Sequence, residues 1–145
     1  MTDFRTLLVP TDFGRSSDAA LEIAIDLASK YGAALDVVHV YEFPSYAYMP
    51  TAPPLVNAVE EAAHTQFDRA MLRVVARKRD AKGFLREGVP WQQILAVQEE
   101  VGADLIVMGT HGRRGVSRTL IGSVAEKVVR MSPVPVLTVH AQRYS

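Results

Sequence analysis

Short apolar runs alternate with helical stripes along this chain, and the runs have the length of buried strands. Each run holds five or six mostly apolar residues, which is typical of strands that are covered on both faces. The clearest predicted strands are residues 6–10 (TLLVP), 35–40 (LDVVHV), 104–108 (DLIVM) and 134–139 (VPVLTV), with a weaker one near residues 82–86. Pro135 places the last of them at a strand start or at an edge of the sheet.

Between these runs, apolar residues recur at helical spacing. The first stripe extends from Ala20 to Tyr31; Gly32 is expected to end that helix, and Ser16 and Ser17 are expected to cap its start. Further helices are predicted over residues 59–75, 90–101 and 124–129. The stretch from Tyr41 to Pro54 holds four prolines and is predicted to be a long loop.

Strands that alternate with helices predict an α/β fold, in which a mostly parallel sheet is covered by helices on both faces. The first two strands and the helix between them form a βαβ unit, whose crossover should be right-handed. Neither an internal repeat nor a linker interrupts residues 1–145, so we expect one domain. Ligands of such sheets bind at the carboxyl ends of the strands, where the strand order reverses.

The composition narrows the classes of function. Hydrophobic residues make up 48% of the chain and 16 Lys+Arg balance 16 Asp+Glu, which excludes a disordered chain and a generic polyanion binder. Because cysteine is absent, a disulfide framework, a thiolate zinc site and a cysteine nucleophile are excluded. Neither a signal peptide nor a membrane-spanning segment is predicted. We therefore expect a cytoplasmic protein with no nucleic-acid or membrane partner.

The loop after residues 104–108 combines glycine, positive charge and a helix start. Gly109, Gly112 and Gly122 allow φ > 0 turns and let backbone approach a ligand, and Ser123 adds a hydroxyl where the last helix begins. The stretch between Leu105 and Ala125 has no acidic residue, and its arginines are Arg113, Arg114 and Arg118. A glycine pair alone would merely turn the chain, but the combination predicts a phosphate site. The spacing matches neither a P-loop nor a dinucleotide fingerprint.

Asp12 directly follows the first predicted strand. Its carboxylate could accept hydrogen bonds from ribose hydroxyls or a base amino group, or it could form an Asx turn into the helix; the sequence leaves both open. His111 lies in the phosphate loop without a second His, Asp or Glu at ligand spacing, so a metal site made of protein side chains is not predicted. His39 is expected to be a satisfied, partly buried imidazole, and His140 a surface residue.

The spacing Gly109-x2-Gly112-x9-Gly122-Ser123 resembles the nucleotide-binding motif of universal stress proteins, of the subgroup that binds ATP. The resemblance extends over the whole chain and includes TLLVPTDF, LDVVHVY, EGVPWQQIL, ADLIVMGTHG, IGSVAEKVV and SPVPVLTV. It implies a five-stranded sheet in the order 3-2-1-4-5, related to α-hydrolase-like nucleotide-binding domains. It also implies a homodimer that joins through the last strand, Val136–Val139, and ATP as ligand, with Mg²⁺ or Mn²⁺ held mainly by the phosphates.

The resemblance also implies roles for individual residues. Asp12 would contact ribose or adenine, the Val40 backbone would pair with adenine, and Gly109 would lie near the ribose. Gly112, Gly122 and Ser123 would form the phosphate cradle, and Val9 and Met108 would flank the base. A phosphate role for Arg113 and Arg114 rests on charge alone. The predicted nucleotide-binding set is completed by the neighbouring residues Pro10, Thr11, His111 and Val124.

Three functional hypotheses follow, and no catalytic residue is assigned. The first is a dimeric, ATP-binding stress-response sensor or switch, because the phosphate loop has no carboxylate of its own to hold a metal for efficient phosphoryl transfer. The second is a slow ATPase or autokinase, with Ser123, Thr119 or Ser117 as phosphate acceptors. The third is a dimeric interaction module whose nucleotide site is vestigial.

Overall fold

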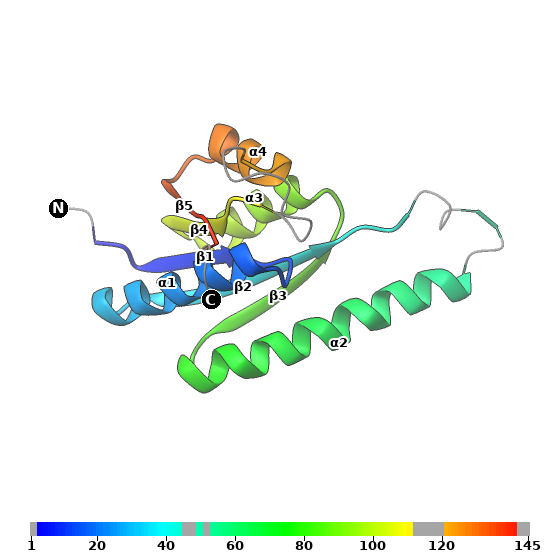
Figure 1. Ribbon diagram of the computed structural model, residues 1–145, viewed down its shortest axis with the longest axis horizontal. Coiled ribbons are helices and arrows are strands. Elements are labelled where there is room, and N and C mark those ends of the chain that lie inside the picture. The colour runs from blue at the N-terminus through cyan, green and yellow to red at the C-terminus, as the bar shows by residue number, and fades with distance from the viewer. Residues whose placement is uncertain (1–2, 45–48, 51–52, 112–120, 142–145) are drawn as a thin grey trace.

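The computed structural model describes residues 3–44, 49–50, 53–111 and 121–141, and its strands lie where the apolar runs predict them. In chain order, the elements are β1 (Thr6–Pro10), α1 (Arg15–Tyr31), β2 (Ala34–Tyr41), α2 (Pro53–Arg77), β3 (Lys82–Glu87), α3 (Pro90–Val101), β4 (Leu105–Gly109), α4 (Ser123–Met131) and β5 (Val136–Val139). The strands form one parallel sheet in the order β3-β2-β1-β4-β5 (Figure 1). The predicted fold class and strand order are confirmed.

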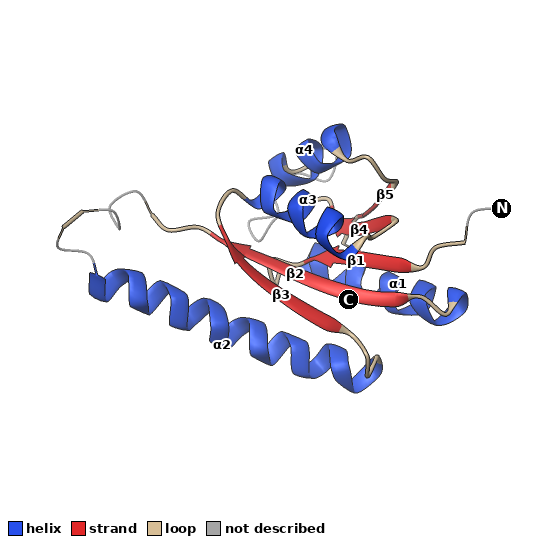
Figure 2. Cartoon of the chain, turned by 180° about the vertical axis from the view of Figure 1, so that it is seen from behind, coloured by secondary structure: helices blue, strands red, loops and turns tan. Residues whose placement is uncertain are grey.

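Alternating side chains of the central strands divide the core between the two faces of the sheet. Leu7 and Val9 of β1 pack with buried residues of α1 and α2, whereas Leu8 between them packs with Ile94 of α3 and Ala125 of α4. Figures 1 and 2 show α2 on one side of the sheet and α3 and α4 on the other. Because both faces are covered, the central strands are apolar throughout rather than alternating.

The strand order reverses at β1. From β1 the chain adds β2 and β3 on one side, then crosses to add β4 and β5 on the other. Helices that connect β1 to β2 and β4 to β5 therefore leave the sheet on opposite faces, since α1 packs on one core cluster and α4 on the other. The carboxyl ends of β1 and β4 consequently border a crevice, which is the usual ligand position in such sheets.

The starts of α1 and α2 differ from the sequence predictions. The prediction that Ser16 and Ser17 cap the first helix is wrong: Gly14 is the N-cap, α1 begins at Arg15, and both serines are buried in its first turn. The second helix begins at Pro53, six residues earlier than predicted, inside the expected loop. Proline is tolerated in the first turn of a helix because the amide hydrogen it lacks has no partner there.

The sheet ends in an edge strand at β5. Pro135 immediately precedes this strand, as expected for a proline at a strand start beside an edge. Among the described residues, none of the helices is both long and apolar enough to cross a membrane.

Candidate functional site

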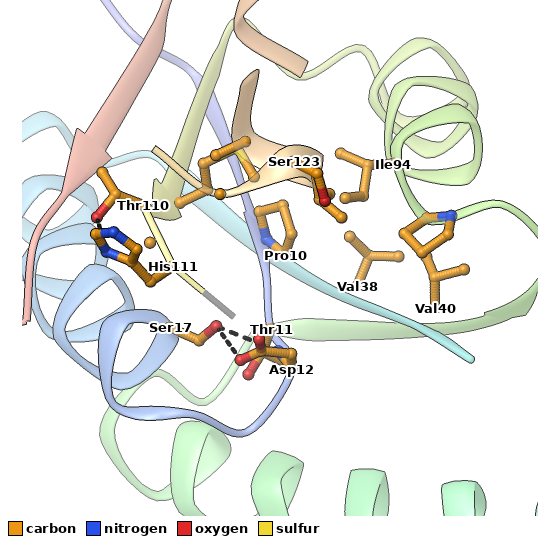
Figure 3. A pocket seen from close by; sticks show the side chains of 16 residues that line it. Pro10, Thr11, Asp12, Ser17, Val38, Val40, Ile94, Thr110, His111 and Ser123 are labelled. Carbon is orange, nitrogen blue, oxygen red and sulfur yellow. Dashed lines mark hydrogen bonds between the residues drawn. The ribbon is translucent and has the colours of Figure 1, made fainter. Parts of the chain in front are cut away.

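A cavity of about 200 Å³ lies at the carboxyl ends of β1, β2 and β4, between the first turns of α3 and α4 (Figure 3). Its position is the crevice that the strand order creates. Ten of the predicted site residues line it: Pro10, Thr11, Asp12, Val40, Met108, Gly109, His111, Gly122, Ser123 and Val124. The fold thus brings together residues that lie more than a hundred positions apart in the sequence.

Some predicted residues lie elsewhere. Val9 is not in the cavity wall; its side chain is fully buried in the core cluster on the α1 side of the sheet, because it points away from the crevice. Gly112, Arg113 and Arg114 lie outside the described residues.

The wall also contains residues that the sequence analysis missed: Ser17, Val38, Pro90, Ile94, Thr110 and Ala125. Val38 could have been found, because it lies two positions before Val40 and residues two apart on a strand share a face. Ile94 lies one turn into α3 and reaches the cavity because α3 packs over β2. No local sequence signal marks it as a ligand-facing residue.

The cavity has an apolar side and a polar side. Val38, Val40 and Ile94 face one end of it, while Asp12, Ser17 and His111 lie toward the other (Figure 3). Pro10 lies between them. A ligand with a flat apolar part and a polar, charged part matches this division, since apolar walls supply burial and a few polar groups set the orientation.

Asp12 is held in one orientation by the start of α1. Its Oδ1 accepts a hydrogen bond from the Gly14 amide at 2.9 Å, which is an Asx turn, and another from the Ser17 hydroxyl at 2.8 Å. The Asp12 amide in turn donates to Ser17 Oγ at 3.2 Å. The Asx-turn alternative is therefore correct, yet within the described chain Oδ2 has no hydrogen-bond partner, so this oxygen remains an acceptor at the cavity wall.

Two glycines of the motif, Gly109 and Gly122, do not form turns with positive φ. The φ angle of Gly109 is not in the positive range. Gly122 is the N-cap of α4 and has an extended backbone with φ −66°. The freedom for positive φ that the sequence allows is therefore not used at these two positions. At Gly109 the reason for glycine is space: an added Cβ would come within 2.5 Å of Ser16 Cβ and 2.6 Å of the Ser16 carbonyl carbon. Glycine here lets α1 approach β4.

The first turn of α4 presents backbone amides to the cavity. The Gly122 amide donates to the Thr110 carbonyl, and the Glu126 amide donates to the Gly122 carbonyl as the first helical hydrogen bond. The amides of Ser123, Val124 and Ala125 precede that bond, and no acceptor for them occurs among the described residues. All three residues line the cavity, so the positive end of α4 faces it.

Thr110 links two imidazoles at the polar side. Its Oγ1 lies 3.0 Å from His111 Nδ1 and 3.0 Å from His140 Nδ1. A hydroxyl has one hydrogen, so Thr110 can donate to at most one of the two rings, and at least one of the two Nδ1 atoms must donate to the Thr110 oxygen. His140 is exposed as expected, but its ring is anchored. His111 Nε2 is the single buried side-chain nitrogen or oxygen without a partner in the described chain.

The backbone ladder between β1 and β2 ends at the cavity. Its last hydrogen bond is donated by the Thr11 amide to the Val38 carbonyl, at 2.8 Å. The next step of a parallel ladder would join the Val40 amide to the Thr11 carbonyl. That bond does not form; the Thr11 carbonyl lies 2.7 Å from His39 Nδ1 instead. The amide and carbonyl of Val40 therefore point past the end of β1 with no partner among the described residues.

A parallel five-stranded sheet with a lined cavity at its switch point defines a doubly wound α/β protein. The sequence model of the universal stress protein family matches residues 3–140. The chain belongs to the universal stress protein family, and the resemblance inferred from its motifs is confirmed.

Comparisons with individual proteins agree with this family assignment. A universal stress protein of Thermus aquaticus is 36% identical over 137 residues, covering 94% of this chain and 98% of that protein. The solved structure of MJ0577 from Methanocaldococcus jannaschii superposes with a TM-score of 0.85 at 24% identity, covering 99% of this chain and all of that one. A universal stress protein solved in complex with cAMP is 29% identical with a TM-score of 0.68, covering 97% of this chain and 100% of that one.

Proposed function

We propose that this protein binds ATP in the cavity at the β1–β4 switch point and acts as a dimeric, nucleotide-dependent switch in a stress response. The observation that carries the proposal is the coincidence in one cavity of an apolar wall, an open backbone edge at Val40 and the amide-bearing start of α4. The complex of a related family member with cAMP supports an adenine nucleotide as the ligand class.

The base would lie on the apolar side. Val38, Val40 and Ile94 provide that side, with Met108 also in the wall. The Val40 amide can donate to a ring nitrogen of adenine while its carbonyl accepts from the exocyclic amino group. Guanine presents a carbonyl and a protonated ring nitrogen along the corresponding edge, so the same two backbone groups would meet it with the wrong polarity. Adenine is therefore the favoured base.

The ribose and phosphates would lie on the polar side. Oδ2 of Asp12 can accept a hydrogen bond from a ribose hydroxyl. The amides of Ser123, Val124 and Ala125 would donate to phosphate oxygens, with favourable polarity from the α4 dipole. The cavity volume of about 200 Å³ is below the roughly 300–1,000 Å³ of clefts that enclose a whole ligand. The cavity would hold the nucleoside end, and the phosphates would extend along the start of α4.

A divalent cation would be coordinated mainly by the phosphates. Within the described ranges, His, Asp and Glu side chains do not gather in groups of three or more that could hold a metal ion. Asp12 is the one carboxylate among the described lining residues, and its Oδ1 is already committed to Gly14 and Ser17. Efficient phosphoryl transfer requires a carboxylate that holds the metal and a group that orients the nucleophile. These features favour a switch over an efficient enzyme.

Slow autophosphorylation is the second candidate function, and the position of Ser123 favours it. Its exposed side chain lies at the start of α4, beside the amides that would bind phosphate. Mass spectrometry after incubation with Mg²⁺-ATP tests this candidate. A mass increase of one phosphate that is lost in Ser123→Ala would establish it, and an unmodified chain would exclude it.

A second copy of the chain would cover β5. This edge strand carries Leu137, which is 40% exposed, and the adjoining α4 exposes Val129 and Met131 by 47% and 54%. Within the part of the chain that the structure describes, no strand pairs with the outer edge of β5. Proteins normally pair or cover an open edge strand that lies beside exposed apolar side chains. Sedimentation should show a dimer for the native chain and a monomer for Leu137→Lys; equal masses would contradict this mode of pairing.

Calorimetry with adenosine, AMP, ADP, ATP and GTP, with and without Mg²⁺, tests the nucleotide proposal. We expect affinity to rise with the number of phosphates, because each added group reaches more of the α4 amides, and we expect GTP to bind more weakly than ATP. A protein that binds none of the adenylates would contradict the proposal and favour an interaction module with a vestigial site.

A further inference from the structure

The open backbone edge at Val40 has a specific cause in the structure. In the β1–β2 ladder, every second residue forms hydrogen bonds to the other strand. At one end the Ala34 amide donates to the Arg5 carbonyl, and at the other end the Thr11 amide donates to the Val38 carbonyl. Continuing this alternation, the Thr11 carbonyl is the natural acceptor for the Val40 amide. That carbonyl is taken by an imidazole instead, at 2.7 Å from His39 Nδ1. Because a carbonyl oxygen has no hydrogen, Nδ1 must carry the proton of this bond.

His39 acts from the opposite face of the sheet to the cavity. Leu35 and Val37, at alternate positions before it on β2, pack in the α1-side core, whereas Val38 and Val40 face the cavity. The ring of Phe13 packs against the imidazole, with centroids 4.3 Å apart and planes tilted by 46°. Phe13 has φ 66°, a left-handed conformation that is unfavourable for a side chain of this size. The imidazole and the Phe13 ring thus hold the chain where it leaves β1.

We propose that His39 is a positioning residue that keeps the Val40 amide open for the base of the nucleotide. Because the Thr11 carbonyl accepts from His39, it does not accept from the Val40 amide. The β1–β2 ladder therefore ends one hydrogen bond before Val40. The Val40 amide and carbonyl then form a donor–acceptor pair at the cavity that selects adenine over guanine. This inference rests on the proposed function, since it explains base selection at the same site. His39 itself does not line the cavity and does not touch the ligand.

The amide of Val40 provides a direct test that needs no ligand. In His39→Leu, the side chain keeps an apolar contact for Phe13 but cannot donate, so the Thr11 carbonyl becomes available to Val40. We expect the Val40 amide to exchange with solvent at least tenfold more slowly in this variant than in the native protein, measured by NMR. A residue with only a structural role would give the opposite sign, because general loosening speeds exchange.

Binding supplies the second measurement. Loss of one hydrogen bond to the base should weaken AMP binding by about tenfold in His39→Leu, while the weaker GMP binding should change little, so the preference for adenine shrinks. His39→Asn places an amide donor near the position of Nδ1 and should restore both the fast exchange and the affinity. His64→Leu is the matched control, because His64 is exposed on α2; it should behave as the native protein.

The outcomes separate this inference from the proposed function. If Val40 exchanges equally fast or faster in His39→Leu, the positioning role is wrong, whatever the affinity. If exchange slows but AMP affinity and base preference stay unchanged, Val40 does not contact the base and the inference is overturned as well. If the native protein binds no adenylate, the proposed function fails and base selection fails with it, while the exchange rates still decide whether His39 ends the ladder.

Discussion

Gly109 lies so close to Ser16 that the two positions cannot both carry a Cβ in their present places. A Cβ built on Gly109 would come within 2.5 Å of Ser16 Cβ and 2.8 Å of the Ser16 carbonyl oxygen. The close approach joins the end of β4 to the first turn of α1, two elements that pack against each other. Because Ser17 in the same turn holds Asp12, the contact also sets the position of the carboxylate in the cavity.

Gly109→Ala should therefore destabilise the protein and weaken nucleotide binding. The new methyl group meets backbone atoms, so α1 must shift, and overpacking of this kind costs about 1–3 kcal/mol. Gly32→Ala is the control: Gly32 has φ 63° but nothing within 4 Å of an added Cβ, so only the backbone strain of about 1–2 kcal/mol applies. Chemical denaturation measures the loss of unfolding free energy in both variants. A smaller loss for Gly109→Ala, with native ATP affinity, would contradict the packing argument.

Ser17→Ala should loosen the Asp12 turn. The hydroxyl is in a residue that is 6% exposed, and it both donates to Asp12 Oδ1 and accepts from the Asp12 amide. Its removal leaves the amide unsatisfied, which costs about 1–2 kcal/mol of unfolding free energy, and we expect a several-fold weaker affinity for adenosine. Ser29→Ala, exposed on the same helix, should change neither quantity appreciably. Equal effects of the two substitutions would show that the Ser17 bonds do not position Asp12.

Ser123→Pro tests the α4 amides without breaking the helix. Proline suits the first helical position, and Gly122 has φ −66° and ψ 160°, a conformation that is compatible with a following proline. The variant lacks one amide donor and the hydroxyl, whereas Ser123→Ala lacks the hydroxyl alone. We expect ATP to bind Ser123→Pro about tenfold more weakly than Ser123→Ala, because bonds to charged groups are the stronger ones.

Adenosine affinity provides the internal comparison for this pair, since it has no phosphate to contact the amide. It should be the same in both variants. Should ATP bind Ser123→Pro as tightly as Ser123→Ala, the phosphates do not rest on the start of α4.

Asp36→Asn should stabilise the protein at neutral pH. Asp36 is 5% exposed on β2, and burial raises the pKa of its carboxyl, with Lys82 on the neighbouring strand opposing the shift and Asp80 adding to it. A raised pKa means that the folded state binds the proton more tightly than the unfolded state. The contribution of Asp36 to the free energy of unfolding is therefore fully present below pH 3.8, and it is lost as pH rises through the folded-state pKa.

Thermal unfolding across pH measures this effect. The melting temperature of Asp36→Asn should exceed that of the native protein at pH 7, and the difference should shrink toward pH 3.8. Asp68→Asn, exposed on α2, is the control and should show no such trend. A gain that grows on acidification would contradict the assigned direction.

Much of the cavity could be predicted because its residues follow strands directly. Asp12 comes after β1, Val40 lies near the end of β2, and Gly109 ends β4; in a parallel sheet these ends share one edge. Residues contributed by helix packing could not be found in this way. The sequence predicts Ser17 as a helix cap, and Ile94 is an apolar residue within the helix predicted over residues 90–101. Only the packed fold places both at the cavity.

The amino-acid sequence by itself determined the class of this protein: apolar runs of strand length separated by helical stripes specify a covered parallel sheet, and the glycine motif identifies the family. Tertiary structure alone decided how the site is assembled. Distances between elements remote in sequence decide whether Gly109 makes room for a ligand or for a helix. They also decide whether the Thr11 carbonyl pairs with Val40 or with His39. Local patterns specify which backbone groups exist; packing decides which of them remain unpaired at the cavity.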